Sequence, residues 1–407
     1  MKCGLLGQKL GHSYSPQIHS QLASYEYSLF EREPQELENF LKNGDFDSLN
    51  VTIPYKKAVI PYLSDLSSVA LWLGAVNTIV RRDARLIGHN SDYFGFSSMV
   101  AKSGLRVARK KVLVLGSGGA SNTAVAVLEV LGAKVVVISR SGKNNYGNLH
   151  LHADAAVIVN ATPVGMYPHV GVSPVDLDLF PHLEGVLDIV YNPARTQLLM
   201  DAEKRGIVTM NGLWMLVAQA KESAEWFSLT DIPDTKINEI HRKLRVEMEN
   251  IVLIGMPGSG KTTVGKLLAN QLGKEFVDAD AAIVEKAGIS IPEIFAQQGE
   301  AGFRRLETQV LAELGKGSGL VIATGGGCVT REENFPLLHQ NGTLFCLDRD
   351  IASLPTDGRP LSQGGDLMDM YRIRKPLYDL FADHHIDCNT APQAAVNEIL
   401  RILEETP

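Results

Sequence analysis

The sequence of 407 residues predicts an α/β fold throughout, with more than one nucleotide-binding module. Short β-branched runs alternate with helical patterns along the chain, which is typical of α/β proteins. Two glycine-rich loops of different design also occur, 116–120 with the pattern of a dinucleotide fingerprint and 255–262 with a complete P-loop. Because one small domain rarely needs both loops, we expect two catalytic modules on one polypeptide.

The composition of the chain limits the kinds of binding partner that we expect. The net charge of −7 argues against a broad surface for nucleic acid or anionic membranes. The four cysteines form no CxxC pair and no zinc spacing, which favours reduced thiols in a cytoplasm. The apolar runs are strand-sized, and the N-terminus lacks the apolar stretch of a signal peptide. We therefore expect a cytoplasmic enzyme of small molecules, with neither nucleic-acid nor membrane partners; the sequence leaves a homo-oligomer undecided.

The order of apolar runs and turns predicts three domains. A strand at 111–115, a glycine-rich turn, a helix stopped by Gly132 and a strand at 135–138 form the start of a dinucleotide-binding unit. A second apolar strand, at 251–254, leads into the P-loop. The predicted domains are an α/β substrate domain at 1–98 plus about 213–246, a Rossmann-like cofactor domain at 99–212, and a P-loop α/β domain with a parallel sheet at 249–407.

The P-loop predicts an ATP site. Its glycines let backbone N–H groups turn toward phosphate oxygens at the N-terminus of the following helix. Lys261 can bridge the β- and γ-phosphates, and the hydroxyl of Thr262 can bind Mg²⁺. No Asn-Lys-x-Asp guanine motif occurs, and the module is short, so a small-molecule kinase is favoured. The predicted ATP-binding residues are Gly258, Ser259, Gly260, Lys261, Thr262 and Thr263.

The residues after the P-loop carry a resemblance. In chain order they are Phe276–Asp280, Gly299-Glu300, Phe303-Arg304, Ala323–Gly327, Gly358–Leu361 and Arg374–Tyr378. This series resembles shikimate kinase over essentially the whole module. The resemblance implies a P-loop kinase that uses Mg-ATP to phosphorylate shikimate.

The same resemblance implies roles for single residues. Asp280 would orient the acceptor hydroxyl, and Asp278 would join Thr262 around Mg²⁺. Lys261 and the lid residue Arg359 would act on the transferring phosphoryl group. The implied substrate-binding residues are Asp280, Arg304 and Arg374, whose arginine forks suit a carboxylate, and the backbone of Gly325, Gly326 and Gly327.

Simpler interpretations remain open for some of these residues. Asp280 can be a helix N-cap, and Arg304 beside Arg305 can lie on a solvated helix face. Asp348 is a rival carboxylate after the apolar run 344–347, and the resemblance gives it no metal role. The family often has a basic residue shortly before the lid arginine, but 354–358 contains none, so the adenine contacts are open.

The dinucleotide module predicts NADP rather than NAD. NAD-binding units usually carry Asp or Glu at the end of the second strand, to hold the ribose 2′-OH. This chain has Ser139-Arg140-Ser141 there, and an arginine with flanking hydroxyls suits the 2′-phosphate of NADP. A surface-loop arginine is the simpler interpretation of Arg140.

The first half resembles shikimate dehydrogenase from residue 1 to about 245. The motifs are His12–Pro16, Asn50–Lys56, Gly74–Thr78, Gly88–Asp92, Asn160–Met166, Asp188–Pro193 and Gly212–Gln219. The resemblance implies NADPH-dependent reduction of 3-dehydroshikimate to shikimate, with Lys56 and Asp92 as the catalytic pair. The other implied substrate contacts are Ser13, Ser15, Thr52, Asn77, Tyr191 and Gln219. The implied NADP contacts are Gly116, Gly118, Gly119, Ala120, Ser139, Arg140, Thr162 and Gly212.

The chain departs from the dehydrogenase pattern in three places. Lys9 replaces a usual proline, and Ser91 a usual threonine. More important, only 142–152 is available where the family places a full helix and a further strand, so we expect one helix of the cofactor domain to be missing or reduced to a loop.

The resulting hypothesis is a bifunctional enzyme of aromatic biosynthesis, in which the product of the first module is the substrate of the second. Three alternatives stay open. The first half can be a degenerate binding module on a working kinase, the dehydrogenase can use quinate, or the kinase can act on another sugar acid. Channelling of shikimate between the modules is not decided by the sequence.

Overall fold

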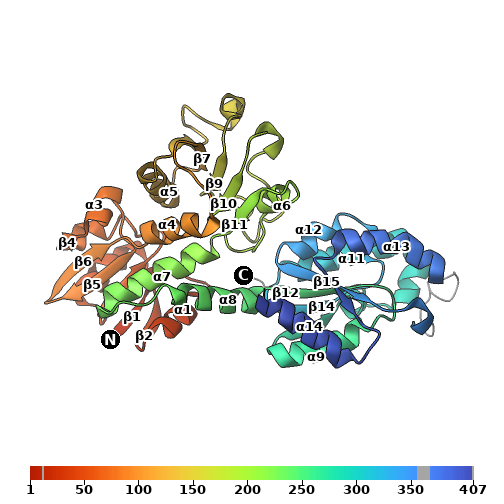
Figure 1. The fold of residues 1–407 in the computed structure, drawn as a ribbon. Helices are drawn as coiled ribbons and strands as arrows, with labels where there is room; N and C mark the ends of the chain where they lie inside the picture. The colour runs from red at the N-terminus through yellow and green to blue at the C-terminus, as the bar shows by residue number, and fades with distance from the viewer. Residues whose placement is uncertain (12, 355–366, 406–407) are drawn as a thin grey trace. The chain divides into compact units, whose positions relative to one another are not determined.

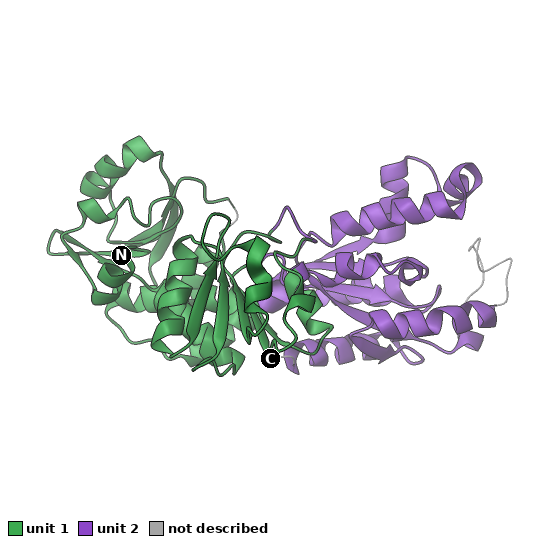
Figure 2. Cartoon of the chain, turned by 90° about the horizontal axis from the view of Figure 1, so that it is seen from above, with its two compact units in different colours: residues 1–166, 172–191, 198–243 green, residues 167–171, 192–197, 244–407 purple. Residues whose placement is uncertain are grey.

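The computed structural model describes residues 1–11, 13–354 and 367–405 (Figure 1). The chain divides into two compact units (Figure 2). Unit 1 comprises 1–166, 172–191 and 198–243, and unit 2 comprises 167–171, 192–197 and 244–407.

Unit 1 begins with a mixed sheet in the order β2-β1-β3-β5-β6-β4. Its strands are β1 (Lys2–Gly7), β2 (Glu26–Glu31), β3 (Ser48–Val51), β4 (Asp65–Leu66), β5 (Thr78–Arg82) and β6 (Arg85–His89). The associated helices are α1 (Ser15–Leu22), α2 (Leu37–Asn43), α3 (Ser68–Leu73), α4 (Asp92–Ser103) and α7 (Leu213–Ser228). Strands β2, β1 and β3 run parallel, whereas β5 is antiparallel to both β3 and β6.

The second sheet of unit 1 is parallel, in the order β11-β10-β9-β7-β8. Its strands are β7 (Lys111–Leu115), β8 (Lys134–Ile138), β9 (Val157–Asn160), β10 (Gly185–Asp188) and β11 (Val208–Met210), with helices α5 (Gly119–Val130) and α6 (Gln197–Glu203). Residues 139–156 are all described, and they contain only the 3-10 segment Tyr146–His152. This confirms that the helix expected after β8 is reduced, and it leaves β8 at the edge of the sheet.

Unit 2 contains a parallel sheet in the order β13-β14-β12-β15-β16. Its strands are β12 (Asn250–Ile254), β13 (Glu275–Asp278), β14 (Leu320–Ala323), β15 (Gly342–Asp348) and β16 (His384–Asp387). Its helices are α9 (Lys261–Leu272), α10 (Ala279–Ala287), α11 (Ile291–Leu314), α12 (Asn334–His339), α13 (Leu367–Phe381) and α14 (Pro392–Glu405). The boundary between the units, at 243/244, falls inside α8 (Thr235–Met248).

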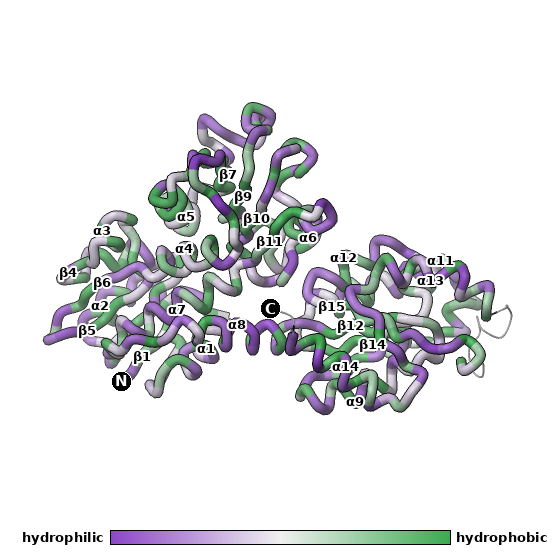
Figure 3. Tube along the Cα trace, viewed as in Figure 1, coloured by the Kyte–Doolittle hydropathy of each residue, from purple (hydrophilic) through white to green (hydrophobic). Residues whose placement is uncertain are grey.

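Alternation along the strands sorts the core of unit 2 into two layers. Ile251 and Leu253 of β12 pack with α9 and α14, whereas Val252 and Ile254 pack with α11, α12 and α13. The same two groups of helices cover opposite faces of the sheet in Figure 1. Strand β12 is buried along its whole length and hydrophobic along most of it (Figure 3), as expected for a strand covered on both faces.

The expected α/β fold with parallel sheets is confirmed, and the strand–turn–helix–strand unit at 111–138 lies as predicted. The three domain boundaries stay a prediction: the one at 98/99 falls inside α4, while unit 1 holds two separate sheets. Within the described ranges, no helix has both the length and the apolar character that crossing a membrane requires.

We expect Gly212→Ala to destabilise unit 1 through packing. An added Cβ would lie 2.0 Å from the carbonyl oxygen of Ile189, so the backbone must shift, at a cost of about 1–3 kcal/mol or more. Chemical denaturation of the cofactor-free protein measures this cost. Gly119→Ala is the control, because its Cβ would meet nothing within 4 Å and alanine suits the helix. Equal stability of the two variants would contradict the packing role.

Candidate active sites

The site in the first sheet of unit 1 is built around an ion pair. Lys56 lies in the turn after β3, and Asp92 is the first residue of α4. The Nζ atom of Lys56 lies 2.5 Å from Oδ2 of Asp92, and the two side chains are 29% and 14% exposed. A half-buried ammonium group held by one carboxylate is suited to move a proton at a bound oxygen.

A chain of buried hydroxyl and amide groups lies close by. The Tyr27 hydroxyl donates to Oδ1 of Asn50 at 2.8 Å and also forms a hydrogen bond with the side chain of Ser15. The Nδ2 group of Asn50 donates to Oγ of Ser223 at 2.8 Å, and that oxygen lies 2.8 Å from Oγ of Ser91. These contacts join α1, β2, β3, α7 and the start of α4 into one polar layer.

Asn77 and Gln219 complete this layer. Oδ1 of the Asn77 side chain accepts from the backbone N–H of Ser91 at 2.8 Å, and Nδ2 donates to the hydroxyl of Ser91 at 3.0 Å. The same hydroxyl lies 3.4 Å from Oε1 of Gln219. Serine at position 91 therefore supplies the hydroxyl that the network needs. Asp92 follows it directly, so the polar layer and the ion pair share one turn of chain.

The remaining predicted substrate contacts lie at three segments, at the start of α1, after β3 and after β10. Oγ of Ser13 accepts from the backbone of Ser15 at 3.2 Å, ahead of α1. The ring of Tyr14, between them, packs edge-on against Tyr191 at 6.2 Å, and burial raises the pKa of Tyr191. Thr52 follows β3, and its backbone donates to the Leu6 carbonyl at 2.9 Å.

The second sheet of unit 1 carries a cavity of about 620 Å³. Its walls come from the segments after β7, β8 and β9: Gly116, Ser117, Gly118, Ser139, Arg140, Tyr146, Ala161, Thr162, Pro163, Val164 and Pro174. Parallel sheets bind ligands at such carboxyl ends, where the strand order reverses. Gly116 has φ +110°, and its Cβ would lie 3.1 Å from the Ala161 carbonyl, so a side chain there would be strained.

This cavity brings together most of the predicted cofactor residues. Gly116, Gly118, Ser139, Arg140 and Thr162 line it. Gly119, Ala120 and Gly212 are not part of its lining. Gly212 is instead packed against the backbone of Ile189 and Val190, which is a structural reason for a glycine there.

Unit 2 holds a cavity of about 730 Å³ that joins the P-loop to a cluster of charged residues. The predicted residues among its lining are Gly258, Gly260, Lys261, Thr262, Thr263, Asp278, Asp280, Arg304, Gly325, Gly326, Gly327 and Arg374. Ser259 is buried outside the lining, and the predicted lid residue Arg359 lies outside the described residues.

The P-loop has the backbone that phosphate binding requires. Gly258 and Gly260 have φ values of +89° and +102°, which favour glycine. Nζ of Lys261 donates to the Gly255 and Met256 carbonyls at 2.9 and 3.0 Å, which holds it inside the loop. The Thr262 hydroxyl donates to Asp278 at 3.1 Å, so two hard oxygen ligands suited to Mg²⁺ are adjacent.

Asp278, not Asp280, is the N-cap of α10. Its Oδ1 accepts from the backbone of Asp280 at 3.1 Å and of Ala281 at 3.4 Å. This corrects the simpler interpretation of Asp280 as the cap. Asp280 lies in the first turn of α10, with its carboxylate against Gly325 at the cavity wall.

Glu307 is a site residue that the sequence interpretation missed. It is 1% exposed, and its Oε2 accepts from Nη1 of Arg304 at 2.8 Å. Burial raises the pKa of Glu307, and Arg304 opposes that rise. Burial lowers the pKa of Arg304, but its contacts with Glu307 and Glu300 more than offset this, so the pKa is raised overall. The i,i+3 spacing on α11 was the signal in the sequence.

The three glycines let the charged side chains approach the backbone. A Cβ on Gly327 would lie 2.1 Å from Nη2 of Arg304, and one on Gly325 would lie 2.8 Å from Oδ1 of Asp280. Nη1 of Arg374 donates to the Gly326 carbonyl at 3.2 Å. A side chain at Gly325 or Gly327 would displace a carboxylate or a guanidinium group, whereas one at Gly326 would meet Pro257 at 2.7 Å.

Ser223 is the second residue that the sequence interpretation missed. It lies one helical turn after Gln219 on α7 and contacts Asn50, Thr78 and Ser91. Its i,i+4 spacing from Gln219 could have revealed it. What the sequence did not show is that β3, β5 and α4 converge on this turn.

The fold and the two sites define a dinucleotide-dependent oxidoreductase module joined to a P-loop phosphotransferase module. A family model described as shikimate dehydrogenase substrate binding domain matches residues 5–79, and one described as shikimate kinase matches 257–404. Shikimate dehydrogenase (NADP(+)) of Clostridium perfringens is 33% identical over 264 residues, which cover 60% of this chain and 97% of that protein.

Solved structures of dehydrogenases are also similar to the first part of the chain. Shikimate dehydrogenase 1 from Peptoclostridium difficile is 37% identical with a TM-score of 0.56, over 60% of this chain and 98% of that one. Quinate dehydrogenase from Corynebacterium glutamicum, in complex with NAD, is 28% identical with a TM-score of 0.53, over 59% and 98%. The chain belongs to the shikimate dehydrogenase family and carries a shikimate kinase domain at its C-terminal end, as a bifunctional enzyme of the shikimate pathway.

We expect Glu307→Ala to destabilise unit 2 by about 3–5 kcal/mol, because it leaves the Arg304 charge buried without its main partner. Glu313→Ala on the same helix is the control. It removes an exposed ion pair with Lys286, worth about 0–1 kcal/mol. Denaturant unfolding of both variants measures the difference in their free energies of unfolding. Similar losses would show that the buried pair contributes no more than a surface one.

We expect unit 1 to lose stability as the pH falls from about 6.5 toward 3, in part through His19. Burial lowers the pKa of His19 to about 3, so in this window the unfolded chain binds a proton that the native state does not. His19→Phe keeps a ring stacked on Tyr27. It should reduce the slope of the unfolding free energy against pH by the amount that binding of about one proton contributes. The exposed His150→Phe is the control; an unchanged slope in His19→Phe would contradict this assignment.

Proposed function

We propose that unit 1 reduces 3-dehydroshikimate to shikimate with NADPH, and that unit 2 phosphorylates the 3-hydroxyl of shikimate with Mg-ATP. The Lys56–Asp92 ion pair beside a buried hydroxyl and amide network supports the first activity. The cavity shared by the P-loop, Asp280 and two arginines supports the second.

The residues of unit 1 suit reduction of a keto group on a hydroxylated acid. NADPH supplies the hydride. Lys56 donates the proton that the new alcohol oxygen needs, and Asp92 holds the ammonium group in place. Hydroxyls of Ser13 and Ser15 and the amides of Asn77 and Gln219 bind and orient the hydroxyl and carboxylate groups of the substrate.

Arg140 supports NADP over NAD. It lies in the cavity wall directly after β8, where NAD-binding units usually carry a carboxylate. Ser139 beside it adds a hydroxyl. The reduced segment after β8 keeps both residues and a cavity of about 620 Å³, which favours a working dehydrogenase over a degenerate binding module.

The residues of unit 2 suit phosphoryl transfer to an alcohol. ATP with Mg²⁺ supplies the phosphoryl group, with Thr262 and Asp278 as the side chains that hold the ion. Arg304 and Arg374 bind the substrate carboxylate, and Asp280 accepts the proton of the attacking hydroxyl. Lys261 and Arg359 meet the charge of the phosphates.

Quinate is the second candidate for the acid used by unit 1, because quinate dehydrogenase shares the fold over 59% of this chain. The two acids differ in the groups around C1, so comparing kcat/KM on shikimate and on quinate separates them. A higher value on quinate would overturn the shikimate assignment without affecting the kinase assignment.

The two activities should be separable by single substitutions. In a coupled assay of dehydroshikimate with NADPH and then ATP, Lys56→Ala should lower NADPH loss by about 10²–10⁴-fold and leave phosphorylation of added shikimate unchanged. Lys261→Ala should do the reverse. Each variant is the control for the other. Loss of both activities in either folded variant would contradict independent sites.

Arg140→Ala should raise the KM for NADPH by about 10-fold or more, because a charged hydrogen bond to the 2′-phosphate is lost. The KM for NADH should change little, since NADH lacks that phosphate. Steady-state kinetics with both dinucleotides measure this, with the exposed Lys143→Ala on the same loop as control. An equal rise in the KM values for NADPH and NADH would contradict the role of Arg140.

A further inference from the structure

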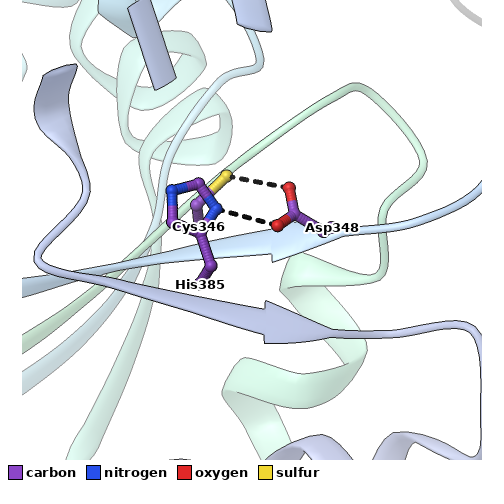
Figure 4. A group of neighbouring side chains, drawn as sticks. All are labelled: Cys346, Asp348 and His385. Carbon is purple, nitrogen blue, oxygen red and sulfur yellow. Dashed lines mark hydrogen bonds and ion pairs between the residues drawn. The ribbon is translucent and has the colours of Figure 1, made fainter. Parts of the chain in front are cut away.

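A cluster of three different metal-ligating side chains lies outside the two sites described. Cys346 and Asp348 are on β15, and His385 is on the neighbouring strand β16, opposite Cys346 in the parallel register. Residues two apart on a strand face the same side of a sheet, so the three side chains gather on one face. Figure 4 shows them pointing toward one another.

The geometry is compact enough for a single ion. Oδ2 of Asp348 lies 2.8 Å from Nδ1 of His385, and Oδ1 lies 3.6 Å from Sγ of Cys346. One ligand atom from each residue lies within 4.8 Å of the others. Ligands of a tetrahedral ion bound at about 2.0–2.3 Å are separated by roughly 3–4 Å, so small shifts are sufficient.

The surroundings add two features of a binding site. A cavity of about 120 Å³ is lined by Cys346 and Asp348, with Met256 and Asp350 also in its wall. Nε2 of His385 lies 3.4 Å from a carboxylate oxygen of Asp379 on α13. Metal-bound histidines almost always present their second ring nitrogen to such an acceptor, which orients the ring.

We propose that Cys346, Asp348 and His385 bind one thiophilic divalent cation of the zinc class. The set of sulfur, nitrogen and oxygen ligands suits zinc, whereas Mg²⁺ and Ca²⁺ take oxygen ligands. A thiolate and a carboxylate balance the two positive charges, and binding releases the thiol proton. Three protein ligands leave one position for water on the exposed side, since the side chains of Asp348 and His385 are 41% and 39% exposed.

The site is chemically distinct from the Mg²⁺ position proposed for the kinase, where Thr262 and Asp278 offer only oxygen atoms. It also gives a role to Asp348, which is the last residue of the apolar strand β15, where a Walker-B carboxylate would lie. An ion here would tie the edge strand β16 to β15, next to Arg349 of the kinase cavity.

Cd²⁺ titration of the reduced full-length protein without nucleotide tests this proposal. We expect thiolate-to-Cd²⁺ ultraviolet absorption that saturates at one ion per chain and is displaced by Zn²⁺. Cys346→Ser should abolish the band, and His385→Gln and Asp348→Asn should each weaken Cd²⁺ binding by about 100-fold. Cys388→Ser and His384→Gln are matched controls, because they lie on or beside β16 but outside the cluster.

Thermal unfolding of each variant shows whether it is folded. If Cys346→Ser does not fold, the variants at the partly exposed residues His385 and Asp348 still test the proposal. A full band in folded His385→Gln and Asp348→Asn, or equal loss in Cys388→Ser and Cys346→Ser, would overturn the proposal. So would the absence of a saturable thiolate band in the unsubstituted protein.

Discussion

The cavity in the second sheet of unit 1 and the cavity of unit 2 both depend on the constraint that parallel strands end at the same edge of a sheet. In unit 1 the segments after β7, β8 and β9 form one cavity, and in unit 2 the P-loop after β12 meets the glycines after β14. Residues far apart in the chain become neighbours for this reason alone. The glycines at these ends then let the backbone approach a ligand or a charged side chain more closely than any Cβ permits.

Charges at the two sites are held in different ways. Lys56 and Asp92 are partly exposed, so solvent shares the cost of keeping both ionised. Arg304 and Glu307 are almost fully buried, and their charges are tolerated because each supplies the other with a close partner. The first arrangement leaves the ammonium group accessible to a ligand, and the second holds a guanidinium group in the cavity wall.

The second sheet of unit 1 keeps its cavity although the connection between two of its strands is short. Between β8 and β9, residues 139–156 form only a 3-10 segment, yet Ser139 and Arg140 remain at the cavity. The residues proposed to meet the dinucleotide sit at the strand ends, and Tyr146 of the 3-10 segment also lines the cavity. The core of this sheet is completed by side chains of the 3-10 segments and α6, including Leu149, Leu177 and Leu198.

The sequence by itself determined the α/β class, the two glycine loops and the short segment after β8, because these depend on local periodicity and on residues adjacent in the chain. It also indicated the Lys56–Asp92 pair, though only through resemblance, since nothing local joins positions 36 residues apart. Only the tertiary structure decided that Asp278 caps α10, that Gly212 is packed against Ile189, and that Glu307 and Ser223 complete the sites. These depend on burial and on contacts between distant segments, which no local pattern encodes.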